Sequence, residues 1–143
     1  MQTFLPLPSI RDSVRVLDPD RLWNQRNEAL VLWRTNSGYY KALGKKGWPH
    51  HPAAKMWRGY DMALATYHNA CIDELEARDA VHSMERLIVV AEPPLPPWFG
   101  NAAFHASHRA ALLYKDSKWY TQFGWTEKAA TPDVKGSLPY VWP

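Results

Sequence analysis

The sequence predicts an all-α protein: a single compact domain over residues 1–143, with about three major helices, an extended N-terminal arm and an aromatic C-terminal tail. Three observations predict it. Apolar residues recur at helical spacing in long segments, prolines and capping residues mark the ends of those segments, and no convincing strand pattern is present. With 143 residues, 46% of them hydrophobic, the chain can bury a core as one domain.

The first major helix is predicted to follow a short arm. Residues 1–17 contain two prolines, which favours an extended arm with a short helical turn at residues 9–16. Asp18 is the expected cap of the next helix, and Pro19 is suited to its first position. The helix is expected to end before Asn36-Ser37-Gly38, and its apolar stripe consists of Leu22, Ala29, Leu30 and Trp33.

A loop rich in glycine and lysine is predicted at residues 39–51. Pro52 is then expected to open a central, buried helix. Its apolar positions are Met56, Tyr60, Ala63, Leu64, Tyr67 and Cys71. A further helical segment over residues 79–91 is expected to continue this helix or to follow a kink.

The last third of the chain begins with a proline-rich connector. Residues 92–97 carry four prolines, so they can form neither a helix nor the interior of a sheet. A third major helix is predicted over residues 101–114. The tail from Lys115 onward is aromatic and polar, and its aromatic residues include Trp119, Tyr120, Phe123, Trp125, Tyr140 and Trp142.

Composition and charge limit the class of protein. One cysteine, Cys71, allows no disulfide within the chain, and neither a signal peptide nor a membrane helix is found, so we expect a cytoplasmic protein with no membrane partner. The net charge is +3, but residues 1–60 hold ten basic and four acidic residues, whereas the remainder holds seven basic and ten acidic ones. This asymmetry indicates a basic face for a polyanion such as nucleic acid.

The first candidate site lies on the helix after Pro19. Arg21, Gln25 and Glu28 share one face at spacings of four and three residues. Such a carboxylate can stabilise a developing cation on a sugar ring or pass a proton, while Arg21 and the neighbouring Arg26 hold phosphates. The alternative is an ordinary surface glutamate paired with an arginine one turn away.

The histidines and a lysine-rich loop are further candidates. His105 and His108 lie three residues apart on one predicted helix, and His50-His51 precede another, but no cysteine or acidic partner has a metal-binding spacing with them. We predict no metal and no cofactor. Phosphate contacts by His51, His105, His108 and Arg109, or core and cap roles for single histidines, are the competing interpretations. Cations interleaved with aromatic residues also favour nucleic-acid binding. They occur in the loop that carries Lys45 and Lys46 and in the tail around Trp119 and Tyr120.

These motifs resemble the pyrimidine-dimer DNA glycosylases of the phage endonuclease V type. The run Arg21-Leu22, Gln25, Glu28 is similar to the active-site helix of that family, in which a His-Leu pair is followed by two glutamates at the same spacing. Glu28 falls on the catalytic glutamate, while Gln25 and Arg21 replace the first glutamate and the histidine. His51 and the Trp119-Tyr120 pair resemble further family positions. The opening Met1-Gln2-Thr3-Phe4-Leu5-Pro6 is typical of a bacterial and phage branch.

The resemblance implies a DNA N-glycosylase, with or without abasic-site lyase activity, that excises damaged or modified pyrimidines from double-stranded DNA. Its nucleophile is the N-terminal α-amine, which attacks the sugar, releases the base and forms an imine. Met1 is usually retained before a residue as bulky as Gln2, so the amine belongs to Met1, or to Gln2 after trimming. The catalytic set is then Glu28, Met1 and Gln2. The DNA-binding set is Arg21, Gln25, Arg26, Lys45, Lys46, His51, His105, His108, Arg109, Trp119 and Tyr120.

Two other functions stay open from the sequence. A non-catalytic DNA-binding protein could use the same basic face, and a metal-dependent hydrolase could use His50, His51, His105 and His108. No obligate protein partner is inferred.

Overall fold

The computed structural model describes all of residues 1–143 as helices and loops, without a strand. The predicted all-α class is therefore confirmed, and its three longest helices are α2, α5 and α6. The chain divides into two compact units. The first comprises Met1–Thr3 with Pro19–Pro97, and the second comprises Phe4–Asp18 with Trp98–Pro143. The single domain over 1–143 stays a prediction.

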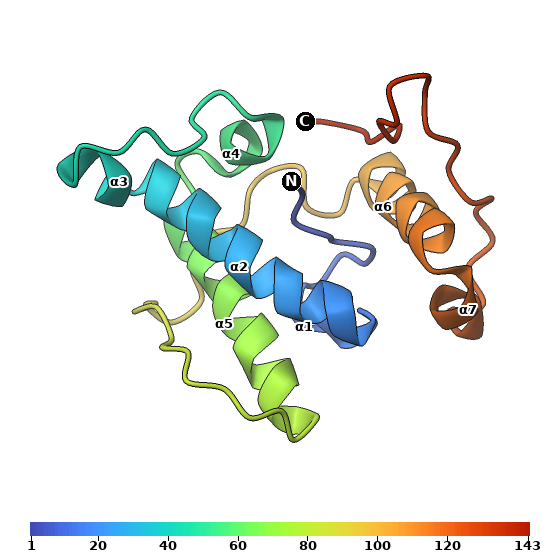
Figure 1. The fold of residues 1–143 in the computed structure, drawn as a ribbon, viewed down its shortest axis with the longest axis horizontal. Coiled ribbons are helices and arrows are strands. Elements are labelled where there is room, and N and C mark those ends of the chain that lie inside the picture. Colours follow the sequence, from blue (N-terminus) through green and yellow to red (C-terminus); the bar gives the residue numbers. More distant parts are fainter. The chain divides into compact units, whose positions relative to one another are not determined.

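The first unit is built on α2 (Pro19–Asn36) and α5 (Asp61–Ala77), which pack side by side (Figure 1). The predicted start at Pro19 is confirmed. The helix continues through Asn36, one residue beyond the predicted end, and Gly38 follows with a φ of +84°. Both helices bury apolar side chains, which include Leu22, Ala29, Leu32, Leu64, Tyr67, Cys71 and Ile72.

Two predictions about the chain between α2 and α5 are wrong in detail. Residues 39–51 are not entirely loop, because Tyr39–Ala42 form a single helical turn, α3. The helix that opens at Pro52 also does not run through to Cys71. It stops as α4 (Pro52–Trp57), and α5 begins at Asp61. Gly59 lies between them with a φ of +85°, a left-handed conformation that interrupts a helix and that glycine adopts readily.

The predicted helix over residues 79–91 is wrong, since that segment is not helical. Helix α5 ends in a Schellman motif: the Ala80 N–H donates to the Leu75 carbonyl, the Asp79 N–H donates to the Glu76 carbonyl, and Asp79 has a φ of +60°. Beyond it, the side-chain amide of Asn69 on α5 holds the backbone of Leu87. Its Nδ2 donates to the Leu87 carbonyl at 2.8 Å, and its Oδ1 accepts the Leu87 N–H at 2.9 Å.

The second unit contains α1 (Ile10–Arg15), α6 (Ala102–Lys115), α7 (Ser117–Tyr120) and a 3-10 turn, η1 (Thr121–Phe123). The helical turn predicted at residues 9–16 is confirmed as α1, with the Ser9 hydroxyl capping the Asp12 N–H. The third major helix is confirmed as α6, capped by Asn101. Residues 92–97 form no helix or strand, as predicted, whereas α7 and η1 were not predicted.

Candidate functional site

The face of α2 that carries Arg21, Gln25 and Glu28 meets the first residues of the chain. Glu28 Oε2 accepts the backbone N–H of Gln2 at 2.8 Å. Gln25 Nε2 donates to the Gln2 carbonyl at 2.8 Å and to Glu28 Oε2 at 3.4 Å. Two side chains one helical turn apart therefore bind both backbone groups of Gln2, and the Glu28 carboxylate touches the nitrogen of the second residue.

A second set of contacts fixes this arrangement. The Tyr67 hydroxyl donates to Gln25 Oε1 at 2.6 Å, so the carbonyl end of that amide faces Tyr67 and its NH₂ end faces Gln2. Trp57 Nε1 donates to Thr3 Oγ1 at 2.9 Å. Gln2 and Thr3 are consequently buried, whereas the Met1 side chain is 41% exposed and Glu28 is half-buried. The start of the chain is held by α2 and α4, while Tyr67 of α5 orients the α2 amide that binds Gln2. The first residue is open to solvent.

His51 lies near the N-terminal amine. Its Nδ1 accepts the Ala53 N–H at 3.0 Å, so it is the N-cap of α4, one of the structural roles that the sequence left open for it. Burial and then the positive charge of the N-terminal amine lower the pKa of His51. The half-buried Arg21 shares the face of Glu28. The structure thus gathers Met1, Gln2, Gln25, Glu28 and His51 in the first unit.

Arg26 does not join this cluster. It is two residues before Glu28, or about 200° away around the helix, so it belongs to the stripe of Leu30 and Arg34 on the other side of α2. Its guanidinium carbon lies 6.0 Å from the centre of the Trp23 ring. Burial lowers the pKa of Arg26, and its Nε is buried without a hydrogen-bond partner. The helical period of about 3.6 residues per turn is enough to place Arg26 and Glu28 on opposite sides of the helix from the sequence alone.

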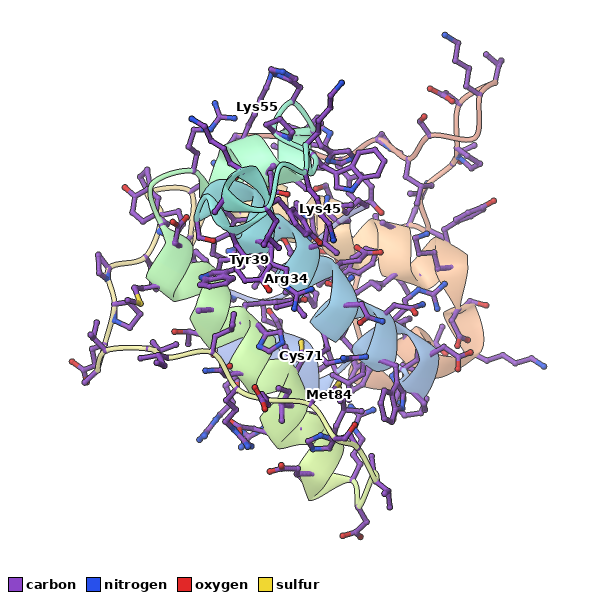
Figure 2. All side chains as sticks on the ribbon, turned by 60° about the vertical axis from the view of Figure 1, so that its left-hand side comes forward. Arg34, Tyr39, Lys45, Lys55, Cys71 and Met84 are labelled. Carbon is purple, nitrogen blue, oxygen red and sulfur yellow. The ribbon has the colours of Figure 1, made fainter.

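Lys45 and Lys46 are exposed in the loop after α3. Aromatic side chains stand exposed around them: Tyr39 is 44% exposed and Trp48 is 55% exposed. Figure 2 labels Lys45 and Tyr39, together with Lys55 on α4. The loop therefore presents cations and aromatic rings to solvent, which is the composition suited to phosphate contacts and base stacking.

His105 and His108 have a different setting, in the second unit. His108 Nδ1 accepts the Leu5 N–H at 2.9 Å, and His105 Nδ1 donates to the Leu5 carbonyl at 2.7 Å. His105 Nε2 accepts the Gly100 N–H at 3.0 Å, which identifies Nδ1 as the protonated nitrogen. Both rings are buried, at 2% and 0% exposure. Burial, and then His105, lowers the pKa of His108 to about 3. The two histidines clamp one residue of the N-terminal arm.

The remaining predicted DNA contacts also make bonds within the second unit. Arg109 binds Glu127 at 2.6 Å and the Pro6 carbonyl at 2.7 Å. Trp119 Nε1 donates to the Val16 carbonyl at 2.7 Å. The buried Tyr120 hydroxyl donates to Asp18 Oδ1 at 2.5 Å. These contacts give each side chain a structural role, and the polar groups named here are already engaged.

Sequence reasoning missed three members of the N-terminal cluster: Thr3, Trp57 and Tyr67. Tyr67 was assigned only to the core. A buried tyrosine hydroxyl needs a hydrogen-bond partner, so Tyr67 could have been recognised as a residue that orients a polar group. No comparable signal marked Thr3. The structure gathers no group of three or more His, Cys, Asp or Glu side chains that could hold a metal ion.

The N-terminal part of the chain is similar to a known protein family. Residues 1–87 match the model of the pyrimidine dimer DNA glycosylase family, which is more than half of the 143-residue chain. The chain therefore belongs to the pyrimidine dimer DNA glycosylase family, whose members are DNA glycosylases that act on damaged DNA. The matched residues include Met1, Gln2, Gln25, Glu28 and His51. No curated protein and no solved structure matches the chain. None of its helices has the length and apolar character needed to cross a lipid bilayer.

Proposed function

We propose that this protein is a DNA N-glycosylase with abasic-site lyase activity, acting on damaged or modified pyrimidines in double-stranded DNA. Glu28 is its catalytic carboxylate, and the α-amine at the start of the chain is its nucleophile. The observation that carries the proposal is the 2.8 Å contact between Glu28 Oε2 and the Gln2 nitrogen. Membership of the glycosylase family supports the reaction class.

The proposed chemistry follows from this contact. A neutral α-amine attacks the anomeric carbon of the sugar, a carbon–nitrogen bond forms, and the bond to the base breaks with its electron pair leaving on the base. The sugar carries positive charge at that stage, and the nearby Glu28 carboxylate stabilises it. The amine then loses a proton, and the bond between the anomeric carbon and the ring oxygen breaks as the nitrogen forms a double bond to that carbon. The ring oxygen takes up a proton, and the product is the open-chain imine that permits strand cleavage. An α-amine suits this step because its ordinary pKa of about 7.7–8.0 leaves part of it neutral at pH 7.

The proposal distinguishes two candidate amines. In the full sequence, the nitrogen beside Glu28 is the amide of Gln2, and the free amine belongs to Met1. Removal of Met1 would turn that same Gln2 nitrogen into the α-amine, already in contact with the carboxylate. We therefore propose Gln2 as the nucleophile of a trimmed chain and Met1 as that of an untrimmed one. The mass of the N-terminal peptide, measured on purified protein, decides between them.

Imine trapping tests the proposal. Incubation with an abasic-site duplex and borohydride should link the protein covalently to DNA, and acetylation of the N-terminal amine or an uncleaved N-terminal tag should stop the linkage with no change in melting temperature. Mass spectrometry of the linked peptide should find residue 1 or 2. A Lys55→Met variant is the matched control and should be trapped normally. Trapping of the blocked protein would place the nucleophile elsewhere.

The alternative is a non-catalytic DNA-binding protein. The specific observation in its favour is that the Gln2 nitrogen, as an amide, is already committed to Glu28 while Met1 is present. A pure binding protein would bind duplex DNA without forming any trapped product, so the same experiment separates the two functions.

DNA affinity should fall steeply with salt, whichever function holds. Phosphates neutralised by protein cations release counterions, and the slope of log K against log[salt] is about −0.9 for each phosphate contact. A Lys45→Glu/Lys46→Glu variant should bind duplex DNA more weakly and with a shallower slope. The control is Lys128→Glu/Lys135→Glu, which makes the same charge change at exposed positions of the second unit. Equal slopes for both variants would show that the loop with Lys45 and Lys46 is not part of the DNA-binding surface.

A further inference from the structure

A pocket of about 370 Å³ lies in the first unit, on the side of α2 away from Glu28. One wall is the α2 stripe of Arg26, Leu30 and Arg34, and a second is His68 on α5. The third wall is the non-helical segment of residues 83–87. Figure 2 labels Arg34 and Met84, which belong to the first and third walls. Nothing in the proposed glycosylase chemistry uses this pocket.

Two positive charges of the pocket, those of Arg26 and Arg34, are not paired with a carboxylate. Arg86 is neutralised, because it binds Asp73 at 2.6 Å and Glu76 at 2.7 Å. Arg26 and Arg34 form no ion pair, and the guanidinium carbon of Arg34 lies 5.0 Å from the centre of the Tyr39 ring. Glu85 also lines the pocket but pairs with neither of them. Two guanidinium groups on one helical stripe thus remain available for an anion.

His68 lies close to the positive charges of Arg26 and Arg34. Its Nδ1 donates to Asn69 Oδ1 at 3.1 Å, since that oxygen also accepts the Leu87 N–H and acts as an acceptor. The ring is buried at 1% exposure. Burial lowers the pKa of His68, and the positive charges of Arg26 and Arg34 lower it further. Both guanidinium groups therefore lie close enough to affect the pKa of a buried imidazole, and a bound anion would offset that effect.

Arg26 adds an unsatisfied donor to the same wall. Its Nε is buried without an acceptor, whereas nearly all buried donors in folded proteins have one. Guanidinium groups bind phosphate through paired, parallel N–H donors. The volume exceeds that of a phosphate alone and falls within the usual range of roughly 300–1,000 Å³ for small-ligand pockets. Leu30, Met84 and Leu87 supply apolar wall for the rest of such a ligand.

We propose that this pocket binds a phosphate group, held by Arg26 and Arg34 beside His68. The phosphate belongs either to a small ligand such as a mononucleotide or to a DNA backbone. The proposal stands on the pocket alone and is independent of Glu28 and the N-terminal amine.

Calorimetric titration of the full chain with inorganic phosphate, and separately with thymidine 5′-monophosphate, tests the proposal. Binding of at least one of them is expected, and Arg34→Gln should weaken it tenfold or more. Arg11→Gln, at an exposed arginine of the second unit, is the matched control and should bind normally. Absence of binding at millimolar concentrations, or equal binding by Arg34→Gln, would overturn the proposal.

A second variant separates loss of the binding site from loss of the fold. Met84→Glu keeps both arginines and adds a negative charge to the pocket wall, so it should lose phosphate binding while keeping the melting temperature. Retained binding by a folded Met84→Glu protein counts against the site. A duplex competition arm identifies the source: displacement of the small ligand by undamaged duplex assigns the phosphate to DNA, and its absence assigns it to a small ligand. Imine trapping, measured in parallel, reports separately on the proposed glycosylase.

Discussion

Replacing Glu28 with glutamine is expected to slow base release by about a hundredfold or more while duplex DNA remains bound. The transition state for base loss carries positive charge on the sugar, and a carboxylate already in place lowers its energy. Glutamine keeps the size of the side chain and an oxygen that can accept the Gln2 N–H, so the 2.8 Å contact can survive the change. The charge is lost, and DNA affinity should persist or rise because a negative group facing phosphates is gone.

The measurements are single-turnover base release, duplex affinity and melting temperature. Asp20→Asn is the matched control, since it removes one negative charge from an exposed position in the first turn of the same helix. It should leave base release unchanged. Normal base release by a folded Glu28→Gln protein would contradict the catalytic assignment, and a structural Glu28 predicts only a small change in stability.

The second large effect is expected in the stability of the second unit, from His108→Ala. The Leu5 N–H would lose its acceptor in a buried position, which costs about 1–3 kcal/mol, and the cavity left between Phe4 and Phe104 adds to that cost. His50→Ala, at an exposed position, is the control. Chemical denaturation measures both. A His108→Ala protein as stable as His50→Ala would mean that the clamp on Leu5 contributes nothing.

The same histidine should make stability depend on pH. Its pKa is about 3 in the folded protein against 6.5 ordinarily, so the unfolded chain binds a proton that the folded one does not. The stabilising contribution is full above pH 6.5 and is lost as pH falls from 6.5 towards 3, by at most about 1.4 kcal/mol per pH unit. His108→Asn keeps an acceptor without a titrating ring and should flatten this dependence. An unchanged pH profile would show that His108 is not buried as a neutral ring.

The sequence predicted those elements whose signals are local. Pro19 starts α2, and Ser9 and Asn101 cap α1 and α6, because each satisfies or removes a backbone donor within its own turn. The predicted helix over residues 79–91 failed for the opposite reason. Asn69, eighteen residues away, bonds the backbone of Leu87 and replaces the bonds that a helix would have made.

The candidate site was predictable to a similar extent. Helical spacing placed Arg21, Gln25 and Glu28 on one face, and the structure agrees. The contact of Glu28 with the Gln2 backbone spans twenty-six residues, and no periodicity encodes it. The sequence showed that His105 and His108 share one helix face. It did not show that both rings bind the backbone of Leu5, because Leu5 lies about a hundred residues earlier.

Asn69 also has a consequence for hydrogen exchange. It binds both backbone groups of Leu87 as a neighbouring strand would, and the residues on either side lack such a regular partner. One protected amide at Leu87 is therefore expected inside a fast-exchanging stretch. The segment can detach by breaking the two bonds to Asn69 and the exposed contacts that Arg86 and His82 make with Asp73 and Glu76. The backbone ladder of α5 stays closed in that event, so the opening free energy of the segment lies below that of global unfolding.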